Sequence, residues 1–105
     1  MKPEFENINL NKNVEKNRFE IEVNGYFAFI DFKESSSRIS LIHTEAEPEL
    51  AGTGAAQAVV EKTLEYIKES GKKLLPFCPY VFGYIKRHKE WKEIVDEGFN
   101  GYDQL

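Results

Sequence analysis

The residue types best suited to bind a ligand lie around two closely spaced glycines near the middle of the chain. Residues 49–56 read ELAGTGAA, so that Gly52 and Gly54 flank one threonine and two alanines follow. Glycines let the backbone approach a ligand closely, and the first turn of a helix presents unpaired N–H groups and a partial positive charge. A pyrophosphate fits that environment, although plain tight turns also carry glycine pairs. The candidate anion-binding residues are Ala51, Gly52, Thr53, Gly54, Ala55 and Ala56.

Two common phosphate-binding motifs do not fit this segment. A dinucleotide fingerprint, G-x-G-x-x-G, would need glycine at position 57, where this chain has Gln57, and it would follow a first parallel strand. A Walker-type phosphate loop needs Lys and then Ser or Thr after its last glycine, whereas Ala55 and Ala56 stand there. The sequence therefore disfavours a nicotinamide site and nucleotide triphosphate hydrolysis.

Three predicted strands precede the glycines. Residues 18–23 (RFEIEV) alternate strictly between apolar and polar, and Asn24-Gly25 follows, a pair that accepts the positive φ of a type I′ hairpin turn. Residues 26–32 are then the partner strand. After a serine-rich turn, residues 38–46 (RISLIHTEA) return as a third strand. These segments predict an antiparallel meander.

A long helix and a further strand are predicted after the glycines. Apolar residues at helical spacing extend from just after Gly54 to Gly71, which lies where a C-terminal cap glycine is expected. Residues 73–78 (KLLPFC) follow as the second strand of a β-α-β unit, and residues 80–95 read as one or two short helices. We predict an α/β (or α+β) fold with a mixed sheet, a β-meander followed by β-α-β-α.

Composition limits the class of protein. The chain has 105 residues, which suits one domain, and we assign residues 18–105 to it and residues 1–17 to an N-terminal tail or edge segment. The net charge of −4 argues against a nucleic-acid binder, which would show a basic surplus. The single cysteine fits a reducing compartment, and no segment resembles a signal peptide or a membrane helix. We therefore expect a cytoplasmic protein with no membrane or nucleic-acid partner.

The order of the motifs resembles the GNAT acetyltransferase superfamily. Its acetyl-CoA motif is Gln or Arg followed by x-x-G-x-G/A, between a strand and a long helix, and here Glu49 replaces the Gln or Arg. The chain resembles more narrowly a small stand-alone GNAT-like family in which glutamate at this place is usual. That family is marked by a His-Thr-Glu strand end (residues 43–45), a P-x-C turn (76–78) and a Y-I-x-x-H helix (84–88). The resemblance covers residues 26–95.

This resemblance implies a cofactor and a reaction. The cofactor is acetyl-CoA, with its pantetheine arm between two parallel strands that splay apart, lined here by residues 42–46 and 75–79. An amine acceptor, on a small molecule or a protein, attacks the thioester directly. Larger members close the acceptor site with strands after the last helix, whereas few residues remain here, so we expect a groove that is open or completed by a partner chain, in a monomer or weak homodimer.

The resemblance also suggests catalytic candidates. Glu45 is the first candidate general base and His43 the second, because both lie where the third strand meets the cofactor. Regular alternation would put His43 on the apolar face of that strand, where a partly buried structural histidine is the plainer interpretation. Cys78 is either a small buried hydrophobe at the cofactor site or a nucleophile, conceivably paired with His43 across adjacent strands. Tyr84 lies near the place of the general acid that protonates the thiolate.

Two further residues and two alternatives complete the sequence-based picture. Residues 72–92 contain six Lys or Arg against one acid, and within them Arg87 and His88 could reach the coenzyme A phosphates, although a basic helix end explains them nearly as well.

The leading hypothesis is an N-acetyltransferase. One alternative is a coenzyme A binding module with little catalysis, and another is an interaction protein that keeps the fold without the ligand.

Overall fold

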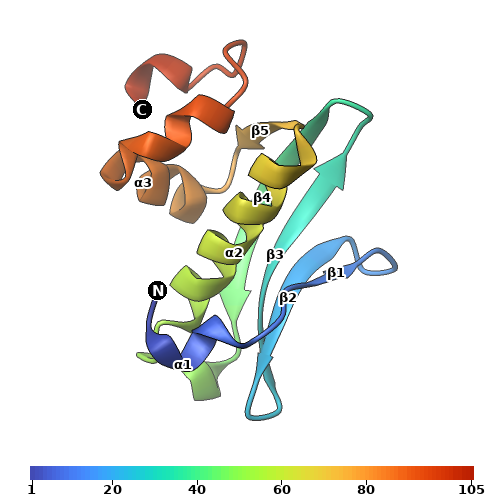
Figure 1. The fold of residues 1–105 in the computed structure, drawn as a ribbon, viewed down its shortest axis with the longest axis vertical. Coiled ribbons are helices and arrows are strands. Elements are labelled where there is room, and N and C mark those ends of the chain that lie inside the picture. The colour runs from blue at the N-terminus through green and yellow to red at the C-terminus, as the bar shows by residue number, and fades with distance from the viewer.

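The computed structural model describes all 105 residues and contains one mixed sheet with the strand order β1-β2-β3-β4-β5 (Figure 1). Neighbouring strands are antiparallel except β4 and β5, which are parallel. The predicted fold class is therefore confirmed. The strands are β1 (Asn11–Asn13), β2 (Arg18–Val23), β3 (Tyr26–Glu34), β4 (Arg38–Ala46) and β5 (Lys73–Pro76).

One long helix connects the two parallel strands. This helix, α2, begins directly after Gly54 and ends before Gly71, whose φ of +77° is the left-handed conformation expected of a capping glycine. The other α-helices are α1 (Pro3–Glu6) and α3 (Pro79–Arg87), with α2 spanning Ala55–Ser70. Three 3₁₀ helices complete the chain: η1 (Pro48–Leu50), η2 (Lys89–Ile94) and η3 (Tyr102–Gln104). No helix has the length and apolar character needed to cross a membrane.

The β2–β3 hairpin turns at the predicted pair. Asn24 and Gly25 both have positive φ, at +53° and +86°, which is the type I′ geometry that matches the twist of the flanking strands. The turn sets the register in which Phe19 faces Ile30 and Ile21 faces Ala28, and all four side chains are buried. The hairpin therefore presents one continuous apolar face.

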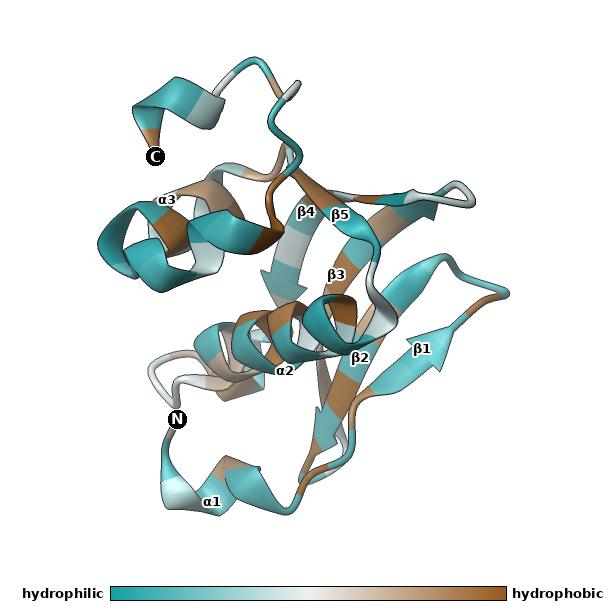
Figure 2. Ribbon diagram, turned by 45° about the horizontal axis from the view of Figure 1, so that its top comes forward, coloured by the Kyte–Doolittle hydropathy of each residue, from teal (hydrophilic) through white to brown (hydrophobic).

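The core lies between that face and α2 (Figure 2). The helix contributes buried side chains at helical spacing, among them Val60, Leu64 and Ile67. The buried part of the chain also includes Phe5 of α1, which is 2% exposed, and β1 pairs with β2. Residues 1–17 thus pack onto the same core as the rest of the chain.

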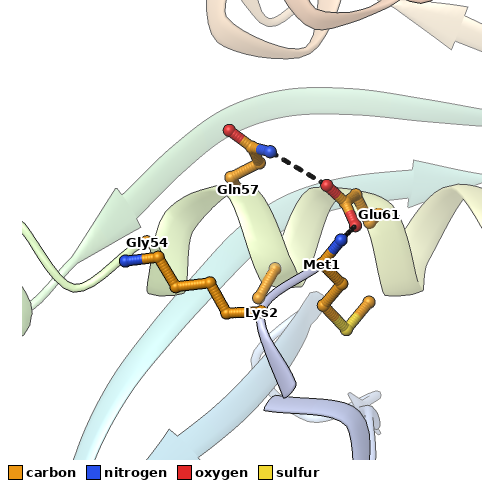
Figure 3. A pocket seen from close by; sticks show the side chains of 6 residues that line it. Met1, Lys2, Gly54, Gln57 and Glu61 are labelled. Atoms are coloured by element: carbon orange, nitrogen blue, oxygen red, sulfur yellow. Dashed lines mark hydrogen bonds and ion pairs between the residues drawn. The ribbon is translucent and has the colours of Figure 1, made fainter. Parts of the chain in front are cut away.

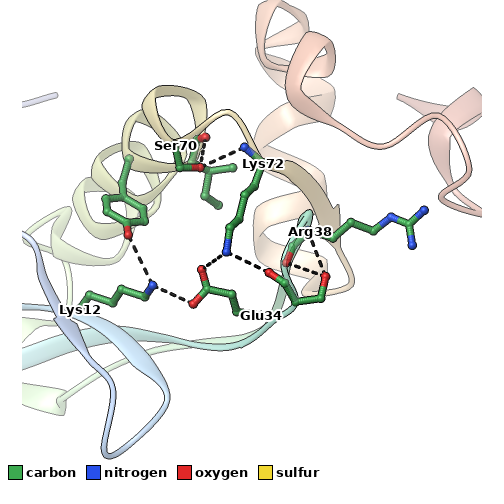
Figure 4. A network of polar contacts seen from close by, with 8 residues as sticks. Lys12, Glu34, Arg38, Ser70 and Lys72 are labelled. Atoms are coloured by element: carbon green, nitrogen blue, oxygen red, sulfur yellow. Dashed lines mark hydrogen bonds and ion pairs between the residues drawn. The ribbon is translucent and has the colours of Figure 1, made fainter.

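A carboxylate on β3 connects both edges of the sheet (Figure 4). Glu34 accepts hydrogen bonds from Lys12 of β1 at 2.7 Å and from Lys72, just before β5, at 2.6 Å. Lys12 also donates to the hydroxyl of Tyr66 on α2 at 3.4 Å. The two ammonium groups, Lys12 first, lower the pKa of Glu34 below its ordinary value.

Strand β4 contains a bulge that the sequence pattern did not predict. Phe32 pairs with Leu41 and Asp31 pairs with His43, so Ile42 is an extra residue in β4. One extra residue moves every later side chain to the other face of the strand. Leu41 is accordingly buried while His43 is exposed, and the prediction that His43 shares the apolar face of Ile39 and Leu41 is wrong.

Candidate functional site

The two parallel strands separate immediately beside this bulge. Their pairing ends where Leu41 faces Pro76, the last residue of β5. The N–H of Cys78 then donates to the carbonyl of Leu41 at 2.8 Å, and the chain turns into α3. The predicted strand 73–78 is therefore two residues too long. Beyond Leu41, β4 continues to Ala46 with no strand paired to its β5-side edge, and we refer to this divergence of the two strands, between residues 42–46 and the start of α3, as the opening.

Cys78 lies at this opening and contacts β4. Its sulfur is 3.3 Å from the hydroxyl oxygen of Thr44, and the residue is 2% exposed. Because the bulge turns Thr44 toward the helices and His43 away from them, no hydrogen bond joins Cys78 to His43. The conceivable pairing of these two residues is thus not seen, and the cysteine has a threonine as its partner.

His43 and Glu45 lie on the face of the sheet away from α2. Their side chains are 59% and 60% exposed, and the imidazole Nε2 is 3.9 Å from a carboxylate oxygen of Glu45. Cross-strand pairing puts Asp31 opposite His43 and Phe29 opposite Glu45. The two candidate bases therefore lie together, in a polar and accessible environment, at the strand that borders the opening.

The glycine turn before α2 forms a group of free backbone donors. Gly52 and Gly54 have φ of +76° and +89°, and the hydroxyl of Thr53 donates to the carbonyl of Leu50 at 2.6 Å while it accepts from the N–H of Ala55 at 3.2 Å. By contrast, the N–H groups of Gly52, Gly54, Ala56 and Gln57 donate to no acceptor within the protein. Free N–H groups at the positive end of a 16-residue helix suit an anion.

A comparison with known protein families agrees with this geometry. A family model described as GCN5-related N-acetyl-transferase matches residues 18–94. The chain belongs to this family. No curated protein, in contrast, is similar enough to the chain to count as a match. The residues matched by the GCN5-related N-acetyltransferase (GNAT) model begin at β2 and end in η2, so they include the glycine turn, the bulge and both sides of the opening.

The residues of this GNAT domain fit the pyrophosphate of a coenzyme A at the glycine turn. A Cβ atom added to Gly54 would lie 3.4 Å from the side chain of Lys2, so the lysine passes directly over the turn in contact distance of this glycine. Lys2 donates from its ammonium to the carbonyl of Thr53 at 2.9 Å. Figure 3 shows the Lys2 side chain beside Gly54. The turn therefore offers backbone donors and a nearby cation to an anionic group.

Helix α3 brings the remaining candidates toward the first half of α2. Tyr84 is buried, and this burial, followed by the negative charge of Glu61 on α2, raises the pKa of its phenol to about 12. The ring of His88 stacks on Tyr84 at a centroid distance of 4.3 Å. Arg87 is exposed and forms no ion pair. Through Tyr84 and Glu61, the end of α3 thus approaches the helix whose N-terminus carries the free donors.

Two contacts at the site were not predicted from the sequence, although Thr44 lies within the predicted lining segment 42–46. Thr44, the partner of Cys78, stands inside the His-Thr-Glu segment, and only its polar character in an apolar strand could have drawn attention to it. Lys2 belongs to the segment 1–17, to which we assigned no function from the sequence, and no local pattern connects it with position 53, more than fifty residues away. Both contacts are long-range and depend on the tertiary fold.

Proposed function

We propose that the protein is an acetyl-CoA dependent N-acetyltransferase that transfers the acetyl group directly to an amine. The observation that carries the proposal is that one unpaired segment of β4 runs between the free N–H groups before α2 and Cys78 at the start of α3. The free N–H groups of Gly52, Gly54, Ala56 and Gln57 follow β4 in the chain. The unpaired edge of β4 at residues 42–46 leads from them to Cys78. In a GNAT domain this is the arrangement that holds the pyrophosphate at one end and the pantetheine arm along the strand.

The reaction needs a base on the acceptor side. Acetyl-CoA supplies a thioester whose carbonyl carbon accepts the amine nitrogen, after which the carbon–sulfur bond breaks and the thiol leaves. An amine that is protonated near neutral pH must first lose a proton, and Glu45 is our first choice for the acceptor of that proton. His43, whose Nε2 is 3.9 Å from a carboxylate oxygen of Glu45, is the second choice.

The acceptor reaches the opening from the sheet face away from α2. The carboxylates of Asp31 and Glu45 and the ring of Phe29 share this face, and these groups attract an ammonium ion. The face already holds one cation in this way, since the guanidinium carbon of Arg18 is 4.3 Å from the centroid of Phe29. A cationic amine therefore fits this side of the sheet better than an anionic acceptor.

Cys78 and Tyr84 have supporting roles in this proposal. The sulfur of Cys78 is buried against Thr44 and has no hydrogen-bonded base, which favours a cofactor-site position over a covalent acyl-cysteine. Burial raises the pKa of Tyr84 to about 12, so the phenol keeps its proton at neutral pH. We propose this phenol as the proton donor to the departing thiolate. Arg87 and His88, at the end of the same helix, are the α3 residues we propose for phosphate contacts.

A coenzyme A binding module with little catalysis is the second candidate. It is favoured by the acceptor side, because none of the cavities in the structure is lined by His43 or Glu45. Enzymes usually position both reactants in a concave site, and an open face positions an amine poorly.

Two measurements separate these functions. A ligand that binds only the native state raises the thermal midpoint, so we expect acetyl-CoA to stabilise the protein. No shift at millimolar acetyl-CoA would refute both candidates. If binding is found, release of free thiol is followed across a panel of cationic, neutral and anionic amines. Turnover above the rate of hydrolysis, greatest with cationic amines, supports the transferase, whereas binding without turnover supports the module.

A further inference from the structure

A lysine from the N-terminal segment lies over the free donors of the glycine turn. The ammonium of Lys2 donates to the carbonyl of Thr53 at 2.9 Å, and the stem of its side chain passes Gly54 with its last carbons 3.4 to 3.6 Å from the place of an added Cβ. Figure 3 shows this side chain running along the start of α2, with Gln57 and Glu61 on the same helix. Lys2 is thus the nearest cation to the turn.

The position of Lys2 is fixed by the fold. Lys2 precedes α1, its carbonyl accepts the N–H of Phe5 at 3.0 Å, and Pro3 restricts the backbone of the first helical residue. Phe5 is 2% exposed and belongs to the main core. The lysine is therefore attached three residues from a buried anchor, and the terminal ammonium of Met1, 3.3 Å from a carboxylate oxygen of Glu61, also holds this segment beside α2.

The sign of the charge at this place is unusual. The N-terminus of a helix carries a partial positive charge and is stabilised by anions, whereas lysines are favoured at the opposite end. Here an ammonium lies beside the first turn of α2 and beside the unpaired N–H groups of Gly54, Ala56 and Gln57. In this structure its one hydrogen bond is to a neutral carbonyl, which leaves donors of the ammonium without a protein acceptor.

An anion between Lys2 and the glycine turn would account for a cation at the positive end of a helix. It would also supply acceptors for the N–H and ammonium donors that have none. We propose that Lys2 is a phosphate-binding residue, which together with the free N–H groups of Gly54, Ala56 and Gln57 holds the pyrophosphate of coenzyme A. This inference rests on the proposed function and extends it to a residue outside the segment 18–94 that the family model matches. The N-terminal segment is then part of the cofactor site and does more than cover the core.

The test compares variants by titration calorimetry with coenzyme A, using the full chain without an N-terminal tag. Lys2→Met keeps the stem and removes the charge, and Lys2→Arg keeps the charge. Lys16→Met removes the same charge from the β1–β2 turn, where the ammonium has no ionic partner. We expect Lys2→Met to weaken binding about tenfold, as loss of a charge-assisted hydrogen bond does, and both other variants to stay within about threefold of the wild type.

Salt provides a readout that a merely structural role would not change. If Lys2 contacts the phosphates, the decrease of affinity with ionic strength is shallower in Lys2→Met than in the wild type and in Lys16→Met. Equal affinity and equal salt dependence of Lys2→Met and the wild type would overturn the inference while leaving the proposed function intact. Tighter binding by Lys2→Met would overturn it too, because the lysine would then block the turn.

The remaining outcomes are also decisive. Absence of coenzyme A binding by the wild-type protein refutes the proposed function itself, and the inference with it. If Lys2→Met lowers the thermal midpoint of the free protein, the comparison is made with Lys2→Arg and Lys2→Gln. Weak binding by Lys2→Gln with wild-type binding by Lys2→Arg then still supports the phosphate contact, and weak binding by both refutes it.

Discussion

Replacement of Gly54 by alanine tests the glycine turn most directly. Gly54 has a φ of +89°, a conformation that costs a residue with a Cβ atom about 1–2 kcal/mol. In a domain of about 100 residues each kcal/mol corresponds to roughly 4–8 °C, so we expect the free variant to melt about 5–15 °C lower than the wild type. The added methyl would also lie 3.4 Å from the Lys2 ammonium, in the space between that cation and the free N–H groups.

Gly25 offers a control matched for strain. Its φ is +86°, and an added Cβ would meet nothing within 4 Å. Gly25→Ala should therefore lose a similar amount of stability without any effect on the glycine turn before α2. Only Gly54→Ala should also lose affinity for acetyl-CoA, and we expect at least about a tenfold loss, or about 1.4 kcal/mol.

The assay is the thermal midpoint of each protein with and without acetyl-CoA. At a ligand concentration of about one hundred times Kd, the wild type gains about 2.7 kcal/mol of stability. We expect Gly25→Ala to keep this gain and Gly54→Ala to lose half of it or more. A full ligand-induced shift in Gly54→Ala would refute the assignment of the pyrophosphate to this turn, even if the protein binds acetyl-CoA elsewhere.

Three further predictions concern the chemistry and the pH dependence of stability. Glu45→Gln should lower kcat about a hundredfold or more with unchanged acetyl-CoA binding, and an unchanged rate would exclude Glu45 as the base. After incubation with labelled acetyl-CoA, intact-protein mass spectrometry should find no acetyl adduct on Cys78, and a stable adduct that an amine discharges would instead support a covalent route. The native pKa of Glu34 lies below its unfolded value, so its contribution to stability is complete above about pH 4.5 and is lost as pH falls through the native pKa. Glu34→Gln should therefore flatten the acid side of the stability curve measured by urea unfolding, whereas an identical curve would show that its two ion pairs contribute nothing.

The secondary structure was predictable because its signals are local. The alternation in residues 18–23, the Asn24-Gly25 turn and the two glycines that flank α2 each fix the conformation of a few neighbouring residues. The sequence placed β4 at its observed residues 38–46 for the same reason. The motif order then indicated the family, which the family model confirms over residues 18–94.

The arrangement of the site was less predictable because it depends on one unpaired residue and one distant contact. Period-two alternation cannot show that Ile42 is an extra residue, since the bulge is defined only by the partner strand. The sequence therefore placed His43 toward the core and near Cys78, whereas Thr44 is the residue found there. In the same way, no local pattern could connect Lys2 with Thr53.

The bulge at Ile42 has a consequence for the movement of protons. It assigns the sulfur of Cys78 and the hydroxyl of Thr44 to the enclosed side of β4, and the imidazole of His43 to the side in contact with bulk water. A proton taken up at His43 or Glu45 can pass straight into solvent, without a relay of side chains through the interior. Without the bulge, regular pairing of the same residues would exchange the two sides and leave the titratable groups facing a dry core, whereas deletion of Ile42 would remove the bulge and keep His43 opposite Asp31 on the side in contact with water.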